Sequence, residues 1–392
     1  MNDNLKIALL TPYPPSKTTL NEYGYYLTGH LADKEEISEL HILTEDTESA
    51  YSAESQKVIF HPCWTFNSLK NPFRIIGKLR KIKPDVVIIN QQFLLFGDNK
   101  VAAALGLMIP FLLKFTGIKS IVLMHNILEE VDLGQAGISS SKLMQFIYNV
   151  IGNVLTRFIL SADLVGVTIE KYVDILTDKY HAKNVVLLPH GTFENPAVPE
   201  FSHVGGAKQV MAFGKFGTYK RVDVLIEAYH KLKEKGNNTL ELVIAGTDSP
   251  NAQGYLADVK KKYAHIEGIR FTGYVPEEEV ATIFTDSTVV VFPYTSTTGS
   301  SGVLHQAGSY GKAVVLPNLG DLGRLIEEEG YTGEYFEPEN VESLSDAIEK
   351  LIDNDVHREK IARQNYQAAT ALGLQDISDW YLIHIDRLKM AD

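Results

Sequence analysis

Cysteine is nearly absent from this sequence, since Cys63 is the only one among 392 residues. A single thiol can build neither a disulfide framework nor a structural zinc site within the chain. We expect Cys63 to be a buried small apolar residue, which is the common role of an isolated cysteine. The scarcity also agrees with a reducing compartment, so a cytoplasmic protein is expected.

Long apolar runs are missing as well. The most apolar stretch, VAAALGLMIPFLLKF at 101–115, is shorter than the roughly 20 residues of a membrane-spanning helix, and Pro110 interrupts it. We expect a pair of buried helices there, with peripheral membrane contact as the alternative. The N-terminus lacks the charged start and long apolar core of a signal peptide. LKIALLT is therefore expected to be a buried strand, and the mature protein is expected to begin near Met1.

The sequence has no excess of positive charge, because its net charge is −12 and its pI is about 5.5. This balance argues against nonspecific nucleic-acid binding, since proteins that bind phosphate backbones are usually basic. A local exception is NPFRIIGKLRKIK at 71–83, which predicts an amphipathic helix with a basic face. That face is either solvated or in contact with anionic lipid, so 71–83 and 101–115 are the two candidates for peripheral membrane contact.

The sequence does contain an alternation of short β-rich runs and longer helical patterns along nearly its whole length. Such alternation is typical of βαβ units, in which a parallel sheet carries helices on both faces. In the first half, the expected strands are 7–10, 40–43, 58–60, 86–89, 121–124, 164–167 and 185–188, and the expected helices include 21–32 and 141–160.

A segment rich in proline and glycine, 189–208, is interpreted as an interdomain linker, after which a second series begins. Its expected strands are 209–214, 240–246, 269–273, 288–293 and 313–318, and its expected helices are 222–235, 254–263, 276–285 and 341–354. The predicted fold class is α/β, with two tandem Rossmann-like doubly wound domains. Ligands of such sheets bind beyond the carboxyl ends of the strands, so a cleft between the domains is the expected site.

The segment GKFGTYKRVDVLIEA, which begins at Gly214, predicts a strand end, a small loop and a helix. Lys215 and Lys220 lie in this loop or at its exit, where two ammonium groups suit the oxygens of a diphosphate. The segment lacks the GxxxxGK[ST] pattern of a Walker loop. Two interpretations stay open here: a diphosphate site, or two solvated surface lysines.

A second loop, TSTTGSSGVLHQAG, begins at Thr295 and contains neither a lysine nor a carboxylate. Small residues let a ligand approach the backbone just before a helix begins. These residues are Gly299, Ser300, Ser301 and Gly302.

The helix after this loop offers its first backbone N–H groups. If Ser301 caps it, the N–H groups of Gly302, Val303 and Leu304 remain for a phosphate. Gln306 follows one turn above Gly302 on the same face and is placed to reach a neighbouring sugar hydroxyl. The alternative is an ordinary strand–loop–helix connection with Gln306 at the surface.

His125 follows the expected strand in VLMHN, at a position where parallel sheets present ligand-facing groups. A buried histidine with a structural partner is equally consistent. Asp353, Asn354 and Asp355 resemble a metal-binding Asp-x-Asp, but they follow a helical pattern and are interpreted as a solvated helix end. No other cluster of carboxylates and histidines suggests a metal, so none is expected.

Taken in order, these segments resemble the glycosyltransferases of the GT-B fold, of the large retaining family 4 type. GKFGTYKRVDVLIEA resembles that family's GR…KG…LL.A segment. LVIAGTD, IRFTGYVPEEEVATIFTDSTVVVFPY, GVLHQAGSYGKAVVLPNLGD and GYTGEYFEPENVESLSDAIEKLI follow in the family's order and spacing. ILSADLVGVTIEKYVDILTDKY and NVVLLPHG resemble the end of its acceptor domain. The resemblance covers nearly all of the chain, and the ordered series carries it.

The resemblance implies transfer of a sugar from a nucleotide diphosphate to an acceptor, with retention of anomeric configuration and no metal. It implies that Lys220 holds the donor β-phosphate and that Lys215 stands where the family usually has arginine. Both would stabilise the departing diphosphate as its charge grows. His125 matches the acceptor-domain histidine near the reacting sugar.

The resemblance also assigns the remaining donor contacts. The backbone of 299–304 would hold the diphosphate. Gly214, at the end of its strand, would belong to the same donor site, and Tyr274 and Val275 would border the base. The N-terminal loop PPSKTTLNEYGYYL matches the loop over the donor, but it lacks the family's glycine pair. The residues in its place are Thr18, Thr19, Asn21 and Glu22.

Two further departures concern the second loop, where Thr298 and Gln306 occupy the positions of two family glutamates. A glutamine still accepts a hydrogen bond from a ribose hydroxyl, but without charge, so donor binding is expected to be weaker by roughly tenfold. Thr298 is too short to reach what the first glutamate reaches.

The sequence therefore predicts a metal-independent glycosyltransferase with two domains. Residues 1–195 are expected to bind a saccharide or lipid-linked acceptor, with a C-terminal helix at 376–392 packing back onto them. Residues 205–375 are expected to bind the nucleotide-sugar donor. The alternative is a non-catalytic relative of the same fold that binds a nucleotide or glycan as a partner subunit or sensor.

Overall fold

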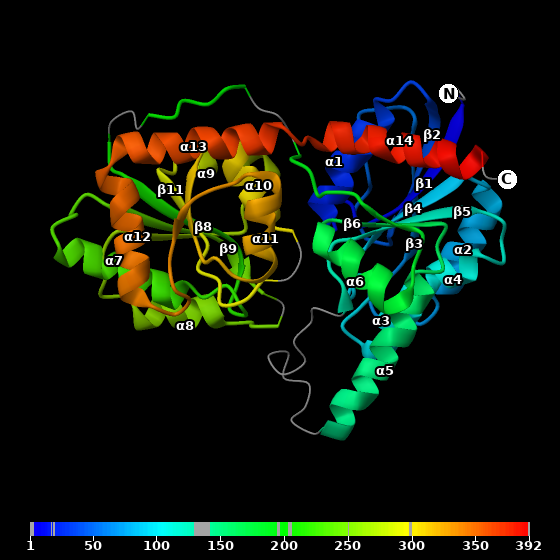
Figure 1. The fold of residues 1–392 in the computed structure, drawn as a ribbon, viewed down its shortest axis with the longest axis horizontal. Helices are drawn as coiled ribbons and strands as arrows, with labels where there is room; N and C mark the ends of the chain where they lie inside the picture. The colour runs from blue at the N-terminus through cyan, green and yellow to red at the C-terminus, as the bar shows by residue number, and fades with distance from the viewer. Residues whose placement is uncertain are drawn as a thin grey trace. The chain divides into compact units, whose positions relative to one another are not determined.

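The structure, a computed structural model, describes residues 4–16, 18, 20–128, 142–193, 197–202, 206–249, 251–297 and 300–390. The chain divides into two compact units. The first unit comprises Met1–Phe193 and Leu374–Asp392, and the second unit comprises Glu194–Gly373. Each unit contains one parallel sheet with helices packed against it, as Figure 1 shows.

The sheet of the first unit has the strand order β3-β2-β1-β4-β5-β6-β7 in the described residues. Its strands are β1 (Leu5–Leu10), β2 (Ile37–Glu45), β3 (Val58–Trp64), β4 (Val86–Gln91), β5 (Lys119–Met124), β6 (Leu164–Val167) and β7 (Val185–Leu187). Its helices are α1 (Asn21–Ala32), α2 (Asn71–Ile82), α3 (Lys100–Leu107), α4 (Ile109–Leu113), α5 (Lys142–Ile159), α6 (Glu170–Tyr180) and α14 (Leu374–Met390).

The sheet of the second unit has the order β10-β9-β8-β11-β12-β13 in the described residues. Its strands are β8 (Gln209–Phe216), β9 (Glu241–Asp248), β10 (Ile269–Gly273), β11 (Val289–Val291), β12 (Ala313–Leu316) and β13 (Glu334–Tyr335). Its helices are α7 (Val222–Glu234), α8 (Tyr255–Lys262), α9 (Glu277–Asp286), α10 (Gly302–Ser309), α11 (Gly320–Glu329), α12 (Val341–Asp353) and α13 (Asp355–Thr370).

The two sheets share one topology, and it confirms the predicted α/β class with Rossmann-like doubly wound domains. In each sheet the first strand in the chain pairs in parallel with both the second and the fourth, so the strand order reverses beside it. Ligands of doubly wound sheets bind at this reversal, beyond the carboxyl ends of the strands. The two expected ligand positions are therefore the carboxyl ends of β1 and β4 in the first unit and those of β8 and β11 in the second unit.

The central strands are apolar because both faces of each sheet are covered. All six residues of β4 are buried, and the sequence VVIIN shows no alternation of polar and apolar residues. Such continuous runs are typical of parallel strands between two layers of helices. In the second unit, one cluster of apolar residues includes Leu225 and Ile348, and another includes Phe284 and Leu304.

Three expectations need correction. β8 continues past Gly214 to Phe216, because Lys215 and Phe216 pair with Thr247 and Asp248 of β9. Lys215 therefore lies in the strand and not in the loop.

The predicted linker 189–208 begins inside the first unit, where His190 and Thr192 are 6% and 2% exposed. Farther along, Phe201 packs on Tyr366 and Arg363 of the second unit. Val275, expected to border a base, belongs to a core cluster.

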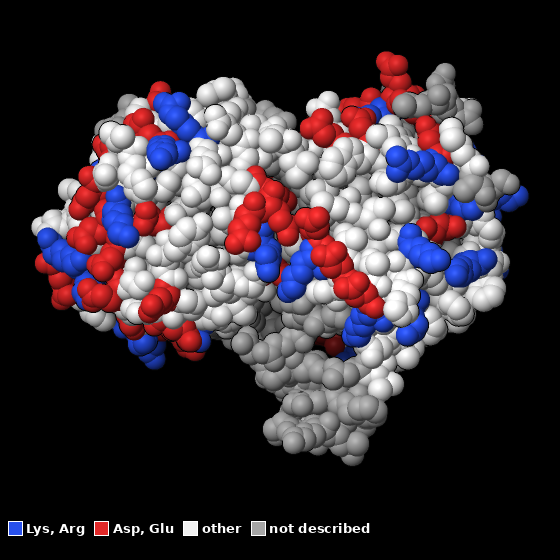
Figure 2. All heavy atoms as spheres, in the orientation of Figure 1, with Lys and Arg blue, Asp and Glu red and all other residues white. Residues whose placement is uncertain are grey.

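The segment 101–115 forms the expected helix pair, α3 and α4, although Val101 and Phe115 at its ends are exposed. No helix of the described residues is both long and apolar enough to cross a membrane. On the face drawn in Figure 2, acidic and basic side chains are interspersed. α14 belongs to the first unit. Lys34, between α1 and β2, forms an ion pair with Asp379 of α14 over 2.5 Å.

Candidate functional site

A pocket of about 90 Å³ opens in the second unit where β8 and β11 end. The loop from β8 to α7 forms one wall, and the loop from β11 to α10 forms the other. The residues that line the pocket are Tyr219, Lys220, Tyr294, Thr297, Ser300, Ser301, Gly302, Val303 and Leu322. The pocket thus lies at the strand reversal where a doubly wound sheet binds its ligands.

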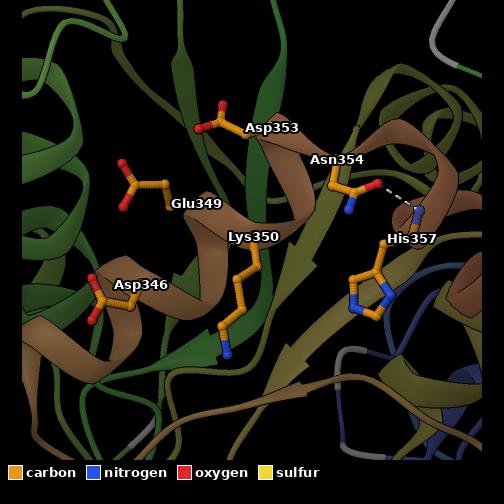
Figure 3. Close-up of a pocket in the computed structure, with 6 residues that line it drawn as sticks. All are labelled: Asp346, Glu349, Lys350, Asp353, Asn354 and His357. Atoms are coloured by element: carbon orange, nitrogen blue, oxygen red, sulfur yellow. Dashed lines mark hydrogen bonds between the residues drawn. The ribbon is translucent and has the colours of Figure 1, made fainter.

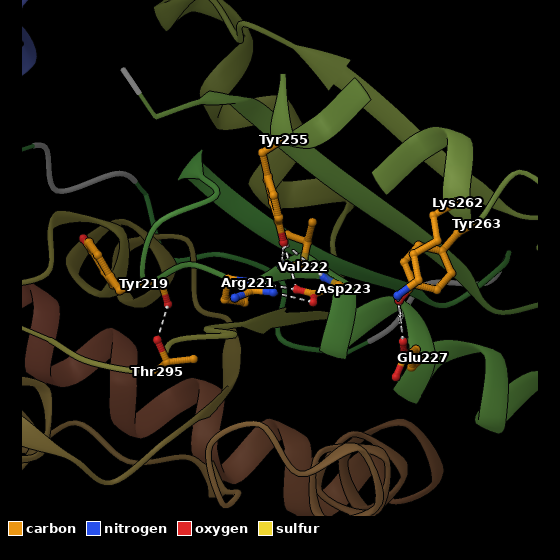
Figure 4. A network of polar contacts seen from close by, with 9 residues as sticks. All are labelled: Tyr219, Arg221, Val222, Asp223, Glu227, Tyr255, Lys262, Tyr263 and Thr295. Atoms are coloured by element: carbon orange, nitrogen blue, oxygen red, sulfur yellow. Dashed lines mark hydrogen bonds and ion pairs between the residues drawn. The ribbon is translucent and has the colours of Figure 1, made fainter. Parts of the chain in front are cut away.

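Backbone hydrogen bonds join the two walls of this pocket. Lys220 and Tyr294 form an isolated antiparallel bridge. The amide of Arg221 donates to Pro293 O over 2.8 Å, and the amide of Thr295 donates to Tyr219 O over 2.9 Å. The side chain of Thr295 also faces the Tyr219 carbonyl, as Figure 4 shows. Two loops from distant parts of the sequence are therefore held as one surface.

Lys220 has its ammonium group inside this surface. Its Nζ lies 4.8 Å from the centre of the Tyr294 ring and 5.8 Å from that of Tyr219, so both rings stabilise the cation. A Cβ atom at Gly214 would lie only 2.8 Å from the same Nζ, and the φ of Gly214 is +131°. A glycine at position 214 thus leaves room for the amine and adopts a backbone conformation that other residues avoid.

The side chains after Lys220 fix the start of α7. Arg221 donates to both carboxylate oxygens of Asp223, over 3.1 and 2.8 Å, and the Tyr255 hydroxyl donates to Asp223 Oδ1 over 2.9 Å. Figure 4 shows these three side chains together. Although burial opposes ionisation, the hydrogen bonds from Arg221 and Tyr255 hold the pKa of Asp223 below its usual value. Asp223 is therefore a carboxylate that anchors the loop behind Lys220.

Lys215 does not share the position of Lys220. It lies on β8, its side chain is exposed, and it is not among the residues that line the pocket. The structure of the second unit therefore brings one of the two predicted lysines, Lys220, to the pocket.

The start of α10 agrees with the predicted cap but changes the set of N–H groups that it offers. The Leu304 amide donates to Ser301 O over 2.9 Å and approaches Ser301 Oγ at 3.4 Å. The prediction that the Leu304 N–H is available for a phosphate is therefore wrong, and its side chain lies in the core. Gly302 and Val303 line the pocket, and the first amides of a helix have no acceptor within it.

The remaining donor candidates of the second unit are placed as follows. Gln306 is 8% exposed, so its predicted alternative as a surface residue is wrong, and it is not one of the residues lining the pocket. Tyr274 is 59% exposed after β10. Thr298 and Gly299 lie outside the described residues.

His305 is a residue of this site that sequence reasoning missed. It is 2% exposed on α10, its Nε2 lies 3.0 Å from Ser300 Oγ, and its Nδ1 lies 2.9 Å from the Tyr331 hydroxyl. The carboxyl of Glu329 follows at 3.6 Å from Nδ1. The sequence could have indicated it, because His305 lies between Leu304 and Ala307, which are both core residues. A polar group on an apolar helix face needs a buried hydrogen-bond partner.

The strand reversal of the first unit carries a different group. Thr11 follows β1, Asn90 lies in β4, and His125 follows β5, so three neighbouring strands supply the three side chains. The His125 ring bonds Asn90 Oδ1 through Nε2 over 2.6 Å, and Asn90 Nδ2 donates to Thr11 Oγ1 over 2.9 Å. The Thr11 hydroxyl donates to the carbonyl of Pro12 over 3.0 Å.

This chain of hydrogen bonds determines the tautomer of His125. A backbone carbonyl only accepts, so the Thr11 hydroxyl donates to Pro12 and accepts from the Asn90 amide. The Asn90 oxygen then faces the ring, which requires the hydrogen on Nε2 and leaves Nδ1 as an acceptor. Burial, with a smaller contribution from His190, lowers the pKa of His125 well below 6.5, so the ring is neutral. His125 is thus a fixed, uncharged hydrogen-bond acceptor.

The predicted acceptor loop is held by residues that the sequence did not single out. Ser16 Oγ donates to Glu45 Oε2 over 2.6 Å, and Thr18 Oγ1 donates to the same oxygen over 3.0 Å. Asn21 Nδ2 donates to Ser16 O over 2.8 Å, which connects the loop to the start of α1. Glu22 lies in the first turn of α1, and Thr19 lies outside the described residues.

A second pocket lies at the end of α12, and Figure 3 shows the residues that line it: Asp346, Glu349, Lys350, Asp353, Asn354 and His357. Asn354 caps α13 by accepting from the His357 amide over 3.0 Å, and Asp355 pairs with Arg358 and Lys208, so 353–355 form a helix end as expected. Within the described residues, no group of three or more His, Cys, Asp or Glu side chains is arranged to hold a metal ion.

The second unit resembles a known protein family. Residues 197–368, which form most of the second unit, match the family model described as Glycosyl transferases group 1. A comparison with curated proteins finds no match.

Solved structures resemble the whole chain. Sucrose-phosphate synthase from Thermosynechococcus elongatus has a TM-score of 0.74 at 14% identity, over 98% of this chain and 99% of that one. Anabaena HepE in complex with UDP-glucose has a TM-score of 0.68 at 14% identity, over 99% and 100%. WaaG, a glycosyltransferase involved in lipopolysaccharide biosynthesis, has a TM-score of 0.67 at 13% identity, over 97% and 99%. At these identities the likeness establishes the fold, which is GT-B.

Proposed function

We propose that this protein is a glycosyltransferase that takes its sugar from a nucleotide diphosphate bound by the second unit. One observation carries the proposal: the ammonium group of Lys220 and the first amides of α10 line the same pocket, at the strand reversal of that unit. The segment that holds this pocket matches the Glycosyl transferases group 1 model. The structurally similar HepE is described in complex with UDP-glucose, which supports a nucleotide sugar as the donor.

The proposed reaction breaks the bond between the anomeric carbon and the β-phosphate oxygen, and the nucleoside diphosphate leaves with the electron pair. The acceptor hydroxyl oxygen forms the new bond to that carbon, and its proton passes to the departing diphosphate oxygen. Negative charge grows on the leaving diphosphate, so a cation already in place stabilises the transition state more than the ground state. Lys220 supplies that charge, and we propose that no metal is needed and that the anomeric configuration is retained.

His125 has a supporting role in this proposal. Because its ring is neutral and its Nε2 hydrogen is engaged by Asn90, it accepts a hydrogen bond from a sugar hydroxyl through Nδ1. It does not serve as a general acid, because the proton would have to come from an imidazolium that burial disfavours. Gln306 and Tyr274 keep the donor roles that the family resemblance assigns, to the ribose and the base.

The acceptor is proposed to be a saccharide or a lipid-linked saccharide bound by the first unit. α2 supports the lipid-linked choice, because Phe73 is 77% exposed beside the exposed Arg74, while Ile75 and Leu79 are buried. Phe73 therefore lies outside the buried apolar face of α2. An exposed aromatic ring among basic side chains suits the interface of an anionic membrane. Phe73→Ala should weaken cosedimentation with anionic vesicles and leave nucleotide binding unchanged.

The test of donor binding is calorimetric titration with UDP, GDP and ADP in the presence of EDTA. We expect one of these nucleotides to bind the unchanged protein, and Lys220→Ala to lose at least tenfold in affinity because a charge-assisted contact disappears. Lys260→Ala is the matched control, since Lys260 is an exposed lysine of α8 in the same unit and is not among the residues lining the pocket. Equal affinity in both variants would refute the role of Lys220.

A second candidate is a non-catalytic relative that binds a nucleotide or glycan as a partner subunit or sensor. The observation that favours it is the neutral Gln306 at a position where the resembled family has a glutamate. Nucleotide binding without any sugar transfer or donor hydrolysis would support this candidate. Turnover that disappears in Lys220→Ala, with the fold intact, would exclude it.

A further inference from the structure

The pocket of the second unit is connected to the protein interior by His305. Its ring is nearly inaccessible to solvent, yet Nε2 lies 3.0 Å from the hydroxyl of Ser300, which lines the pocket together with Lys220. On the other side, Nδ1 lies 2.9 Å from the Tyr331 hydroxyl. Neither of these two contacts has a part in the proposed mechanism.

The position of the ring hydrogen determines what Ser300 offers to the pocket. If Nε2 carries the hydrogen, it donates to Ser300 Oγ, and the serine hydroxyl hydrogen is available to a ligand oxygen. If only Nδ1 carries it, Nε2 accepts from Ser300, and the pocket faces serine lone pairs that repel an anion. The Tyr331 hydroxyl selects the first arrangement when it donates to Nδ1.

A buried carboxyl lies beside the same ring nitrogen. Glu329 Oε2 is 3.6 Å from Nδ1, and its side chain is 11% exposed. Burial, with a smaller contribution from the neighbouring Glu328, raises the pKa of Glu329 to about 8. At neutral pH the carboxyl is therefore uncharged, and it does not draw the hydrogen onto Nδ1.

From α13, the backbone of Asn365 and the methyl group of Ala369 approach Gly308, next to the Tyr331 ring. Glu328 is on α11 with Glu329, and Tyr331 follows that helix. The ionisation of Glu329 is thus one charge change beside His305 between neutral and alkaline pH.

We propose that His305 is a positioning residue, which turns the Ser300 hydroxyl hydrogen toward the diphosphate of the bound nucleotide. The inference rests on the proposed function, because it requires an anion in this pocket. The Ser300 hydroxyl would be a hydrogen-bond donor in a segment, 295–315, whose one lysine or arginine is Lys312. Lys312 donates to the carbonyls of Thr285 and Ser287. The serine hydroxyl then adds to the charge that Lys220 contributes.

A double-mutant cycle tests this coupling. The affinity of the nucleotide that binds the unchanged protein is measured for Ser300→Ala, His305→Leu and the double variant. Each single variant should lose about five- to tenfold in affinity, because each removes the same hydrogen bond to an anion. The double variant should lose no more than either single one, since coupled changes do not add.

Conservative variants guard against a fold defect at the buried position. His305→Gln retains an amide N–H that can donate to Ser300 and should recover most of the affinity. Tyr331→Phe removes the hydroxyl that fixes Nδ1 as an acceptor and should lose affinity in the same direction as His305→Leu. Circular dichroism of each variant verifies that the second unit is folded.

A pH profile gives a readout that a purely structural histidine would not change. Nucleotide affinity should fall by about fivefold as the pH rises past about 8, because ionised Glu329 draws the hydrogen to Nδ1 and Ser300 ceases to donate. Glu329→Gln should remove this fall, and Ser300→Ala should remove it too. The titration of the nucleotide itself cancels in the comparison between variants.

The outcomes separate the inference from the proposed function. If the unchanged protein binds none of UDP, GDP and ADP, the proposed function fails and the inference fails with it. If the unchanged protein binds a nucleotide and folded His305→Leu and Tyr331→Phe bind it equally well, the inference alone fails. Additive losses in the double variant would also overturn it, because His305 would then act independently of Ser300.

Discussion

The two units bury ionisable side chains of opposite kinds beside their strand reversals. The first unit holds His125 and His190 as neutral bases, because burial lowers the pKa of His125 well below 6.5 and that of His190 to about 4. The second unit holds Glu329 as a neutral acid, because burial raises its pKa to about 8. The first unit should therefore lose stability toward acid pH, and the second should lose it as the pH rises.

The same contrast applies to the ligand-facing groups. In the first unit, a chain of hydrogen bonds that ends at the Pro12 carbonyl gives His125 one tautomer. In the second unit, His305 lies between two hydroxyl groups, which can each donate or accept, and near a carboxyl that titrates. Under the proposed function, the first is a fixed neutral site for sugar hydroxyls and the second is an adjustable charged site for the diphosphate.

The tryptophans make the comparison measurable within the intact chain. Both of them, Trp64 and Trp380, belong to the first unit. Tryptophan fluorescence therefore reports on unfolding of the first unit alone, whereas circular dichroism reports on both units.

The largest expected effect concerns Glu329→Gln. The folded unit retains the Glu329 proton up to pH about 8, while the unfolded chain releases it near 4.5, so the free energy of unfolding falls as the pH rises between these values. The change approaches about 5 kcal/mol above pH 8 as an upper bound, and the glutamine variant should lack it. Urea titrations followed by circular dichroism at pH 5 and above pH 8 measure it, with Glu327→Gln as the exposed control on the same helix. An equal pH dependence of the unfolding free energy in wild type and Glu329→Gln would contradict the assignment of Glu329 as a buried neutral acid.

The next effect concerns His190 in the first unit. The folded unit keeps this ring neutral down to pH about 4, whereas the unfolded chain protonates it near 6.5, so stability is lost as the pH falls from 6.5 toward 4. The loss amounts to about 3 kcal/mol. His190→Gln should reduce this slope in urea titrations followed by tryptophan fluorescence, whatever its stability at neutral pH. A slope unchanged from wild type would contradict the assignment of His190 as a buried neutral base.

Gly214→Ala should have an intermediate effect and should be confined to the second unit. The added Cβ meets Lys220 Nζ, and the φ of +131° is strained for alanine, at a cost of about 1–3 kcal/mol. Nucleotide affinity should fall by roughly tenfold as the amine is displaced. Gly236→Ala offers a control, because its φ is also positive but nothing lies within 4 Å of the added Cβ. Wild-type nucleotide affinity in Gly214→Ala would show that Lys220 does not need its present position.

The smallest effect is expected for Tyr255→Phe. The variant loses the hydroxyl that donates to Asp223 and accepts from the Val222 amide, which should lower the stability of the second unit by about 1 kcal/mol. The change should appear in circular dichroism and not in the fluorescence midpoint of the first unit. A shift of the tryptophan signal by the same amount would mean that the two units unfold together, and the comparison would have to be measured on separated units.

The elements of the fold were predictable because they depend on local patterns. β12 is an uninterrupted apolar run and β4 is apolar over its first four residues, and α1 begins and ends at the predicted residues 21 and 32. The end of β8 was misplaced because Gly214 indicated a strand end, whereas pairing of Lys215 with Thr247 of β9 extends the strand. Such pairing depends on a partner that local sequence does not contain.

The candidate site divides along the same line. Lys220 and the small residues before α10 were predictable, because a lysine and a glycine–serine loop after two strands form a local signal. Glu45 and Glu329 were not, because each acts on a residue 24 to 29 positions away in the chain and only the fold brings the partners together. The prediction that the Leu304 N–H is available to a ligand was wrong. The sequence shows that Ser301 can cap the helix, but it does not show which N–H donates to the serine oxygens.

In the proposed function, the second unit binds the diphosphate through Lys220, and His125 interacts only with the sugar. The most direct test is calorimetric titration of Lys220→Ala and His125→Asn with the nucleoside diphosphate, beside turnover of the corresponding nucleotide sugar. We expect Lys220→Ala to lose nucleotide affinity and turnover, and His125→Asn to keep the affinity and lose turnover. If nucleotide binding survived in Lys220→Ala and disappeared in folded His125→Asn, the account would be contradicted.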